Sequence, residues 1–345
     1  MYRTFQSGAA CAASAFALLA TGAVQAAPCA PGSPQLVISH AGSLNATFQP
    51  VEALFTARTG VCIVDLEGGS VKLARELLQD RGTIDIFASA DPEVNDRMLK
   101  PAGLASYTIR FAEGAMVLAY TTASKHADTI ATAGAAGVAP RAAADWAAQL
   151  AAPGVTIGAS HPFLDPGGYR ADMMLQLAQL QAGTPQLYNT LLSHVVITRS
   201  GDTLGKTFDY QFTYDHSARA ALARDKTGTY RYVTLPDAVN LGAAGSAGAA
   251  YAAASVTMPG IAGPGSTPLR MPATRVAFGL SIVADAPNRQ RAEQFLALFL
   301  SPEGVALRAA GPTTIDPAQV DQADIAQVPA AIRTLVRAMP AATLK

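Results

Sequence analysis

The sequence predicts an α/β protein of two lobes joined by two strands that pass from one lobe to the other. First, apolar runs typical of buried strands alternate with segments of helical spacing between Gln35 and Tyr120. Second, an apolar strand returns late in the chain, at Arg275–Val283, and an amphipathic helix follows it. Third, a length of 345 residues, half of them hydrophobic, suits about two domains. We predict a first lobe of residues 27–118 and 280–345, and a second lobe of residues 119–279.

The first 26 residues have the composition of an export signal rather than of the fold. A positive residue, Arg3, precedes a short alanine-rich apolar stretch at Ala12–Ala23, and Val24–Ala26 supplies small residues where a signal peptidase cleaves. The stretch is short for a membrane span, and an N-terminal anchor helix is the alternative. We therefore expect residues 1–26 to be a cleaved signal peptide and the mature protein to be periplasmic.

Removal of that segment leaves two cysteines, Cys29 and Cys62, which lie close to the first two predicted strands. An oxidising compartment permits a disulfide between them, which typically adds about 2–4 kcal/mol of stability, and two unpaired thiols are the alternative. The five histidines are scattered and show no metal-ligand spacing. We expect no bound cofactor.

The first-lobe elements follow a strand–helix alternation, which indicates a parallel sheet covered by helices. Leu36–Ile38, Cys62–Leu66 and Ile84–Ala88 predict its strands. A helix led by Pro92 follows the third, because proline suits a first helical turn and the preceding aspartate suits the N-cap. The run Gly114–Tyr120 predicts a longer strand that crosses into the second lobe.

The second lobe is expected to mix helices with two further strands. A Gly/Ala/Pro-rich stretch at 242–272 indicates a small helix and a long surface loop. The expected helices lie around 142–150, 170–181 and 186–192, and the expected strands at 210–214 and 230–235.

Small and hydroxyl-bearing residues follow three of the predicted strands, each time just before a helix. They occur at His40–Ser43, Gly68–Ser70 and Gly158–Ser160, the last followed by the helix start Asp165–Arg170. A helix N-terminus offers unpaired N–H groups at the positive end of its dipole. Several such ends in one cleft make an anion site that needs no lysine or arginine. The pattern therefore predicts a small oxyanion as the ligand.

Each candidate ligand group also has a structural alternative. Ser43 and Ser70 can donate to an oxyanion, or they can simply cap their own helices. Asp165 should repel a dianion, and its alternative is a helix cap. As a ligand it would either accept a proton from the anion or bond directly to the central atom. We expect Tyr214 to donate its phenol and Arg170 to brace the loops through carboxylates.

The composition excludes some function classes and leaves rivals. A formal net charge of zero and the lack of a basic stripe argue against a nucleic-acid partner. Hydrolase, metalloprotease, P-loop and dinucleotide motifs are missing from the sequence, so we expect no enzyme. A secreted hydrolase built on Ser43 and His40, or a small-molecule sensor module, remains an alternative.

Five segments in order resemble the periplasmic molybdate/tungstate-binding proteins of ABC transporters, in particular their tungstate-binding subfamily. Glycine at position 167 replaces a cysteine of the family's D-P-C-G-Y-R motif. The segments are His40–Leu44, Gly69–Ser70, Asp85–Asp91, Asp165–Arg170 and Asp209–Tyr214, the last followed by Leu235–Pro236 and Asn240–Gly242.

The resemblance implies a type II periplasmic binding fold, an oxyanion ligand, a membrane permease as partner and a monomeric protein. It also implies that Asp165 bonds the molybdenum or tungsten atom, with a second carboxylate from Asp202, although the chain is shorter than the family just before Asp209. Another tetrahedral oxyanion, such as sulfate or phosphate, is the alternative ligand. The implied ligand residues are Gly42, Ser43, Ser70, Asp165, Pro166, Gly167, Tyr214 and Asp202.

Overall fold

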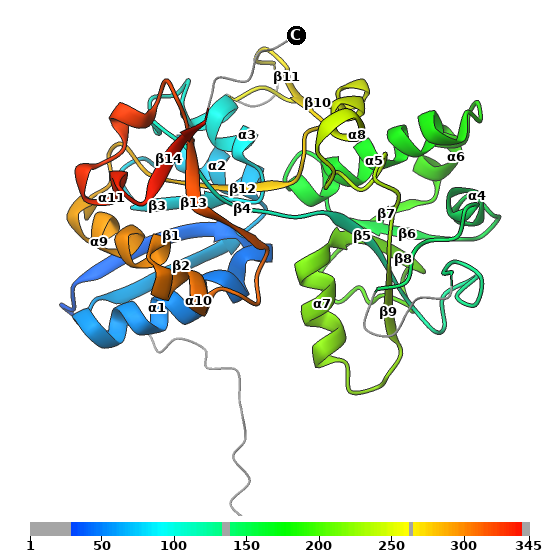
Figure 1. Ribbon diagram of the computed structural model, residues 1–345, viewed down its shortest axis with the longest axis horizontal. Coiled ribbons are helices and arrows are strands. Elements are labelled where there is room, and N and C mark those ends of the chain that lie inside the picture. Colours follow the sequence, from blue (N-terminus) through cyan, green and yellow to red (C-terminus); the bar gives the residue numbers. More distant parts are fainter. Residues whose placement is uncertain (1–28, 133–138, 262–264, 340–345) are drawn as a thin grey trace, which may run out of the picture.

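The computed structural model describes residues 29–132, 139–261 and 265–339, so the expected signal peptide lies outside the described residues. The chain forms two α/β lobes, each built on its own sheet (Figure 1). The first sheet contains β1 (Gln35–Ala41), β2 (Cys62–Gly68), β3 (Ile86–Ser89), β4 (Ile109–Glu113), β12 (Ala277–Ile282), β13 (Thr313–Asp321) and β14 (Val336–Met339). The second contains β5 (Met116–Thr121), β6 (Ile157–Ala159), β7 (Val195–Ile197), β8 (Tyr210–Tyr214) and β9 (Tyr230–Thr234).

Helices cover the two sheets, and a separate hairpin pairs β10 (Ser255–Met258) with β11 (Leu269–Pro272). The larger helices are α1 (Asn45–Thr59), α2 (Ser70–Gln79), α5 (Pro166–Ala182), α6 (Leu187–Ser193), α7 (Asp215–Arg224) and α9 (Arg289–Leu300). The shorter ones are α3 (Pro92–Val94), α4 (Trp146–Leu150), α8 (Gly245–Ala249), α10 (Pro302–Leu307) and α11 (Ala330–Arg333), with single turns η1 (Gly42–Leu44), η2 (Asn95–Leu99), η3 (Ala250–Ala253) and η4 (Ile325–Gln327).

The first sheet has the order β14-β13-β4-β12-β3-β1-β2, with β1 parallel to both β2 and β3. The register aligns Ala41 with Gly68, so the loops after β1 and β2 leave the same edge of the sheet. Ligands of open α/β sheets bind beyond the carboxyl ends of the strands. The parallel pairing therefore sets two of the predicted loops side by side.

The second sheet has the order β7-β6-β8-β5-β9, in which β6 and β8 are parallel neighbours. β8 ends at Tyr214 and leads directly into α7, while β6 ends at Ala159 before the loop that opens α5. The predicted α/β class with two lobes is confirmed.

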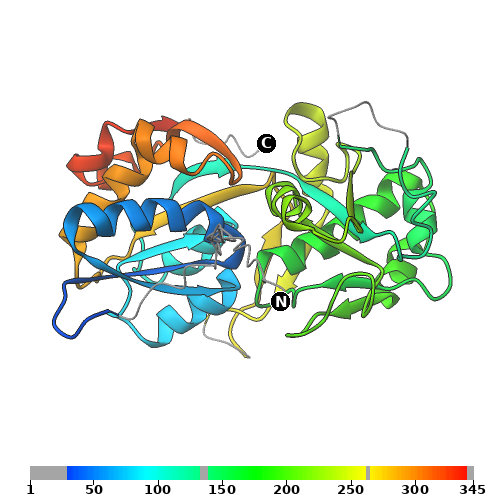
Figure 2. The same ribbon diagram turned by 90° about the horizontal axis from the view of Figure 1, so that it is seen from below.

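Two segments cross between the lobes, and they are hydrogen-bonded to each other. β4 passes through Gly114 into β5, and a return segment passes through Val276 into β12; the Gly114 N–H donates to the Val276 carbonyl at 3.1 Å. Figure 2 shows the lobes side by side with these connections between them. The crossings at Gly114–Ala115 and Val276 lie a few residues before the predicted boundaries 118/119 and 279/280.

Phenylalanines from α1, α9 and β4 form an aromatic cluster in the core of the first lobe. Phe48 of α1 packs 4.8 Å from Phe299 of α9, measured between ring centroids, and Phe111 of β4 lies edge-on to Phe299 at 5.2 Å.

Cys29 and Cys62 form a disulfide that ties the start of the described chain to β2. Among the described residues, no helix is long and apolar enough to cross a membrane.

Candidate functional site

A pocket of about 310 Å³ is lined by residues from both lobes. The first lobe contributes Ala41, Gly42, Ser43 and Gly68, which end β1 and β2. The second lobe contributes Met116, Ser160, Asp165, Gly167, Gln211, Phe212, Thr213, Tyr214 and Ser217. None of these lining residues is a lysine or an arginine, and Asp165 is the only carboxylate among them.

The first loop presents main chain and one hydroxyl to this pocket. η1 follows β1 directly, and the residues that cap η1 and α1 are Ala41 and Leu44, neither of which makes a side-chain cap bond. Ser43 therefore does not act as the helix cap that was its structural alternative. Its carbonyl accepts a hydrogen bond from His216 Nε2 of the second lobe at 2.9 Å.

Ser70 is not on the pocket wall. It is the first residue of α2, it is fully buried, and its hydroxyl oxygen accepts the Ala90 N–H at 3.1 Å. The residue at the N-cap is Gly69, so the hydroxyl one position later turns toward the end of β3. Gly68 takes the place on the wall that the sequence assigned to Ser70.

Asp165 lies on the wall and is also the cap of α5. Its Oδ1 accepts the Gly167 N–H at 2.7 Å, so the capping alternative and a place in the pocket both hold. Burial raises the pKa of Asp165, against hydrogen bonds from Gly167 and Ser160 and the charge of Arg170, which lower it. Pro166, the first residue of α5, is buried and off the wall.

Tyr214 ends β8 with its phenol oxygen bonded to Arg170. Arg170 Nη1 donates to that oxygen at 2.9 Å, which leaves the tyrosine's own proton free for another acceptor. Arg170 Nη2 lies 3.2 Å from Asp91 Oδ2, and Tyr169 donates to the same carboxylate at 2.7 Å. The expected bracing role of Arg170 is confirmed, and the pKa of the buried Tyr214 phenol is raised, chiefly by burial.

The structure does not bring Asp202 to the pocket. Its Oδ2 accepts the Arg199 N–H at 2.8 Å in a turn, and Gly201 between them has φ of 92°. That left-handed glycine folds the carboxylate back onto its own loop. The wall near β8 carries Gln211, Thr213 and Ser217 instead.

Sequence reasoning missed some residues on the wall. Ser160 was not among the implied ligand residues, but it lines the pocket, and its hydroxyl bonds Asp165. Ser217 lies in the first turn of α7, directly after Tyr214. The sequence feature that could have identified Ser217 is the strand–helix junction at 214–215. A hydroxyl-bearing residue follows the strand there, as it does after β1, β2 and β6.

The lobes meet through several hydrogen bonds around the pocket. The Lys72 N–H of α2 donates to the Leu164 carbonyl at 3.0 Å, and a Cβ at Gly69 would lie 2.4 Å from that carbonyl oxygen. Glycine at position 69 permits this close approach of the two backbones because it has no Cβ. Arg75 of α2 also donates to the carbonyls of Pro259 and Gly260 at 2.7 and 2.9 Å, next to β10, which packs on α5.

The histidines beside the first loop are not arranged for hydrolysis. His40 Nδ1 lies 2.8 Å from the Ala41 carbonyl and its Nε2 2.9 Å from Asp65 Oδ1. His216 meets the carbonyl of Ser43 rather than its hydroxyl, and burial lowers its pKa. This geometry offers Ser43 no general base among these two residues.

The fold and the site together define a class: a two-lobed α/β protein with an inter-lobe pocket of hydroxyls, amides and one carboxylate. The family model described as "Bacterial extracellular solute-binding protein" matches residues 36–311. The chain belongs to this family of extracellular solute-binding proteins.

Two relatives whose names state a ligand are similar to this chain over most of its length. The chain is 29% identical over 303 residues to the molybdate/tungstate-binding protein WtpA of Thermococcus kodakarensis, covering 78% of each chain. It is 28% identical over 304 residues to WtpA of Pyrococcus abyssi, covering 78% of this chain and 81% of that one.

Solved structures share the fold at low sequence identity. The periplasmic molybdate-binding protein of Azotobacter vinelandii matches with a TM-score of 0.53 at 18% identity, over 80% of this chain and 96% of that one. The sulfate-binding protein SubI of Mycobacterium tuberculosis matches with a TM-score of 0.56 at 14% identity, over 89% and 93%. The periplasmic-binding fold implied by the sequence resemblance is therefore confirmed.

Proposed function

We propose that the protein captures molybdate or tungstate in the inter-lobe pocket. The observation that carries this proposal is the donor set of the wall. Hydroxyls and main-chain groups of Ser43, Gly42, Ser160 and Ser217 line a space that a half-buried carboxylate, Asp165, also lines. Such a wall suits an anion held by neutral donors.

Asp165 is the reason for preferring a metal-centred oxyanion to sulfate. Sulfur and phosphorus at full oxidation do not readily add a fifth ligand, whereas molybdenum and tungsten do. A carboxylate oxygen would donate an electron pair to the metal, nothing would leave, and the coordination number would rise from four to five. With Asp202 turned away in this structure, one carboxylate is available for that bond, which makes octahedral coordination by two carboxylates the weaker expectation.

The names of the relatives support the same ligand. Both WtpA proteins are molybdate/tungstate-binding proteins, and each covers more than three quarters of this chain. We infer that the protein works in the periplasm as a monomer after cleavage of residues 1–26, and that it delivers its anion to the permease of an ABC importer without catalysing a reaction. The inter-lobe bonds of Lys72 and Arg75 would favour the closed, loaded form that such a permease recognises.

Calorimetric titration of the mature protein with tungstate, molybdate, sulfate and phosphate tests the proposal. We expect saturable binding of tungstate and molybdate at one site, with sulfate and phosphate failing to compete at similar concentrations. Preferential binding of sulfate would reassign the ligand. Turnover of an ester or phosphoester would instead support the hydrolase alternative.

A further inference from the structure

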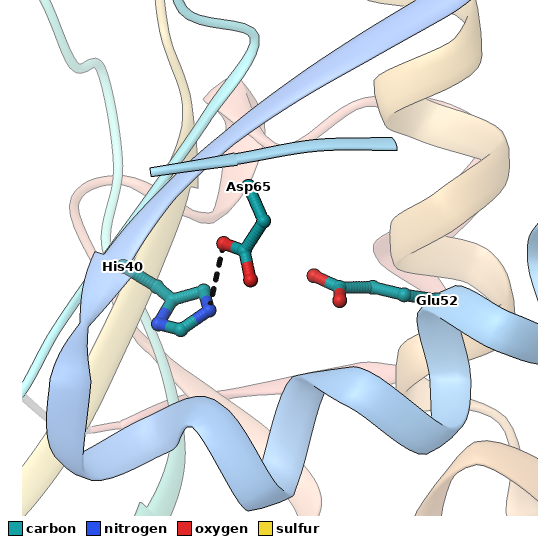
Figure 3. A group of neighbouring side chains, drawn as sticks. All are labelled: His40, Glu52 and Asp65. Carbon is teal, nitrogen blue, oxygen red and sulfur yellow. Dashed lines mark ion pairs between the residues drawn. The ribbon is translucent and has the colours of Figure 1, made fainter. Parts of the chain in front are cut away.

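His40 occupies a buried position directly behind the first loop of the pocket. It lies near the end of β1, one residue before Ala41, and its ring stacks on Phe48 of α1 with centroids 4.9 Å apart. Asp65 of β2 and Glu52 of α1 face the same ring (Figure 3). The three side chains offer ligand or proton-binding atoms within 4.8 Å of one another.

Both ring nitrogens of His40 face oxygen acceptors. Nδ1 lies 2.8 Å from the Ala41 carbonyl oxygen, and Nε2 lies 2.9 Å from Asp65 Oδ1. A neutral imidazole has one N–H and could satisfy only one of these contacts. The doubly protonated ring satisfies both. Burial alone would lower the pKa of His40, but the hydrogen bond to Asp65 and the charge of that carboxylate outweigh burial and raise it.

Glu52 is the third titratable group of this cluster. Its side chain is 8% exposed, and Oε1 has no hydrogen-bond partner among the described residues. Burial first, and the Asp65 charge second, raise the pKa of Glu52 to about 8. Glu52 therefore holds its proton at neutral pH, and the carboxyl group in contact with His40 is that of Asp65.

Protons explain this geometry better than a metal ion does. Ligand atoms about 2.1 Å from a tetrahedral zinc lie roughly 3.4 Å apart. His40 Nε2 and Asp65 Oδ1 are 2.9 Å apart, which is the length of a charge-assisted hydrogen bond. The two side chains therefore form an ion pair rather than a metal site.

The contact with Ala41 connects this cluster to the pocket. A trans peptide sets its C=O and the following N–H in opposite directions. The Ala41 carbonyl is held toward His40, so the Gly42 N–H of the same peptide is directed away from it. The register that pairs Ala41 with Gly68 directs this N–H toward β2, so the peptide is held on both sides. Gly42 and Ser43, which follow the peptide, line the pocket.

We propose that His40 is a positioning residue of the anion site: its Nδ1–H holds the Ala41 carbonyl, and with it the peptide from which the first loop, Gly42 and Ser43, enters the pocket. The proposal rests on the anion-binding function argued above. It adds that the affinity depends on the protonation of a residue that never touches the ligand. Loss of the Nδ1 proton would set a nitrogen lone pair against the Ala41 carbonyl oxygen and so loosen this peptide.

The groups that act on His40 come from both elements packed against its ring. β2 contributes Asp65, and α1 contributes Glu52, whose own ionisation is opposed by Asp65 and by Glu67 of β2. As the pH rises, Glu52 ionises around pH 8, which adds a negative charge that favours the imidazolium. His40 should therefore lose its proton later than an isolated histidine.

Two substitutions separate the two contacts of His40. An asparagine side chain places an N–H close to the position of Nδ1, whereas a glutamine reaches toward the position of Nε2. We expect H40Q to weaken molybdate binding by about tenfold, corresponding to about 1.4 kcal/mol. H40N should restore most of that loss and, having no titratable ring, should show a flatter dependence of affinity on pH than the wild type. H126N is the matched control, because His126 is exposed and has φ of 61°, which asparagine tolerates.

A measurement on the wild-type protein needs no variant to fold. Nitrogen-15 NMR of the histidine rings, followed from about pH 6 to about pH 9, reports the pKa of His40 with and without molybdate. Because linkage is reciprocal, a tenfold preference of the anion for the protonated form should raise that pKa by about one pH unit on binding.

Each outcome decides between the two proposals. Molybdate binding with an unchanged His40 pKa, or equal affinities of H40N and H40Q, would overturn the positioning role and leave the proposed function intact. A wild-type protein that binds none of the four oxyanions would overturn both. A rise of the His40 pKa on binding, together with the H40Q loss, would establish the positioning role.

Discussion

The first-lobe half of the pocket wall is built from main chain and one hydroxyl, whereas the second-lobe half presents a carboxylate and a phenol. Each half has a buried cation behind it. His40 stands behind the first loop and is paired with Asp65, while Arg170 stands behind Tyr214 and is paired with Asp91.

The two cations differ in the pH range where they can lose a proton. Arginine stays charged at every physiological pH, and the pKa of Arg170 is raised further, although its burial opposes this. Histidine titrates near neutrality. Arg170, behind the second-lobe wall, therefore keeps its charge, whereas His40, behind the first-lobe wall, can gain or lose a proton as the pH changes. Four predictions test this difference, beginning with the largest expected effect.

Replacing Arg170 with methionine should destabilise the protein by about 3–5 kcal/mol, because it leaves the Asp91 charge buried without its partner. Arg170 is 1% exposed and Asp91 2% exposed, so water cannot substitute for the lost contact. Urea unfolding measures the loss. The double variant R170M/D91N should recover much of it, and a loss below about 1 kcal/mol would show that the pair is not a main support.

Replacing Glu52 with glutamine should change how stability depends on pH. The folded protein holds the Glu52 proton up to about pH 8, whereas the unfolded chain releases it near the ordinary glutamate pKa of 4.5. This group therefore contributes stability at low pH that is lost as the pH rises through that window. E52Q cannot ionise, so its stability relative to the wild type should rise by on the order of 3 kcal/mol between pH 5 and pH 9.

The second lobe supplies the control for that experiment. The stability difference between R170M/D91N and the wild type should stay flat over the same pH range, because arginine keeps its charge throughout it and neither substituted side chain titrates. Parallel pH profiles for E52Q and the wild type would remove the contrast between the lobes.

Replacing Asp165 with asparagine should separate its two roles. Asparagine caps helices as well as aspartate does, so α5 should stay intact. If the carboxylate bonds the metal atom, tungstate affinity should fall by at least about tenfold, about 1.4 kcal/mol, while weak sulfate binding is unchanged. Competition calorimetry measures this, and tighter binding of every anion would mean that Asp165 only repels its neighbour.

Replacing Ser43 with alanine should give the smallest effect. The hydroxyl caps neither η1 nor α1, so stability should change by less than about 0.5 kcal/mol. Loss of one neutral donor should weaken anion binding by about fivefold, about 1 kcal/mol. Y214F is the matched variant in the other half of the wall, and equal affinity of S43A and the wild type would remove Ser43 from the site.

The sequence predicted the parallel part of the fold well, because β1, β2 and β3 are each an apolar run that precedes a helix. It predicted less of the long Gly/Ala/Pro-rich stretch, where the structure has the hairpin β10–β11 instead of an open loop. β13 was not foreseen, since Pro317 and the acidic residue before it interrupt the β-branched residues of Thr313–Asp321. Its strand character depends on pairing with β4.

The site was predicted to the level of its loops but not of every side chain. Gly42, Ser43, Asp165, Gly167 and Tyr214 all line the pocket. Ser70, Pro166 and Asp202 do not. Successive residues at a helix start point about 100° apart, so whether a serine faces the ligand or the core depends on which residue is the cap. No short motif in the sequence contains that information.

The hydrogen bond between Gly114 and Val276 has a mechanical consequence. Two connecting segments that are hydrogen-bonded to each other bend readily but resist twisting. We expect the lobes to swing about a single axis and to return to the same mutual orientation each time. A membrane receptor that touches both lobes at once would then sense one well-defined spacing between them when the protein is loaded, and a different one when it is empty.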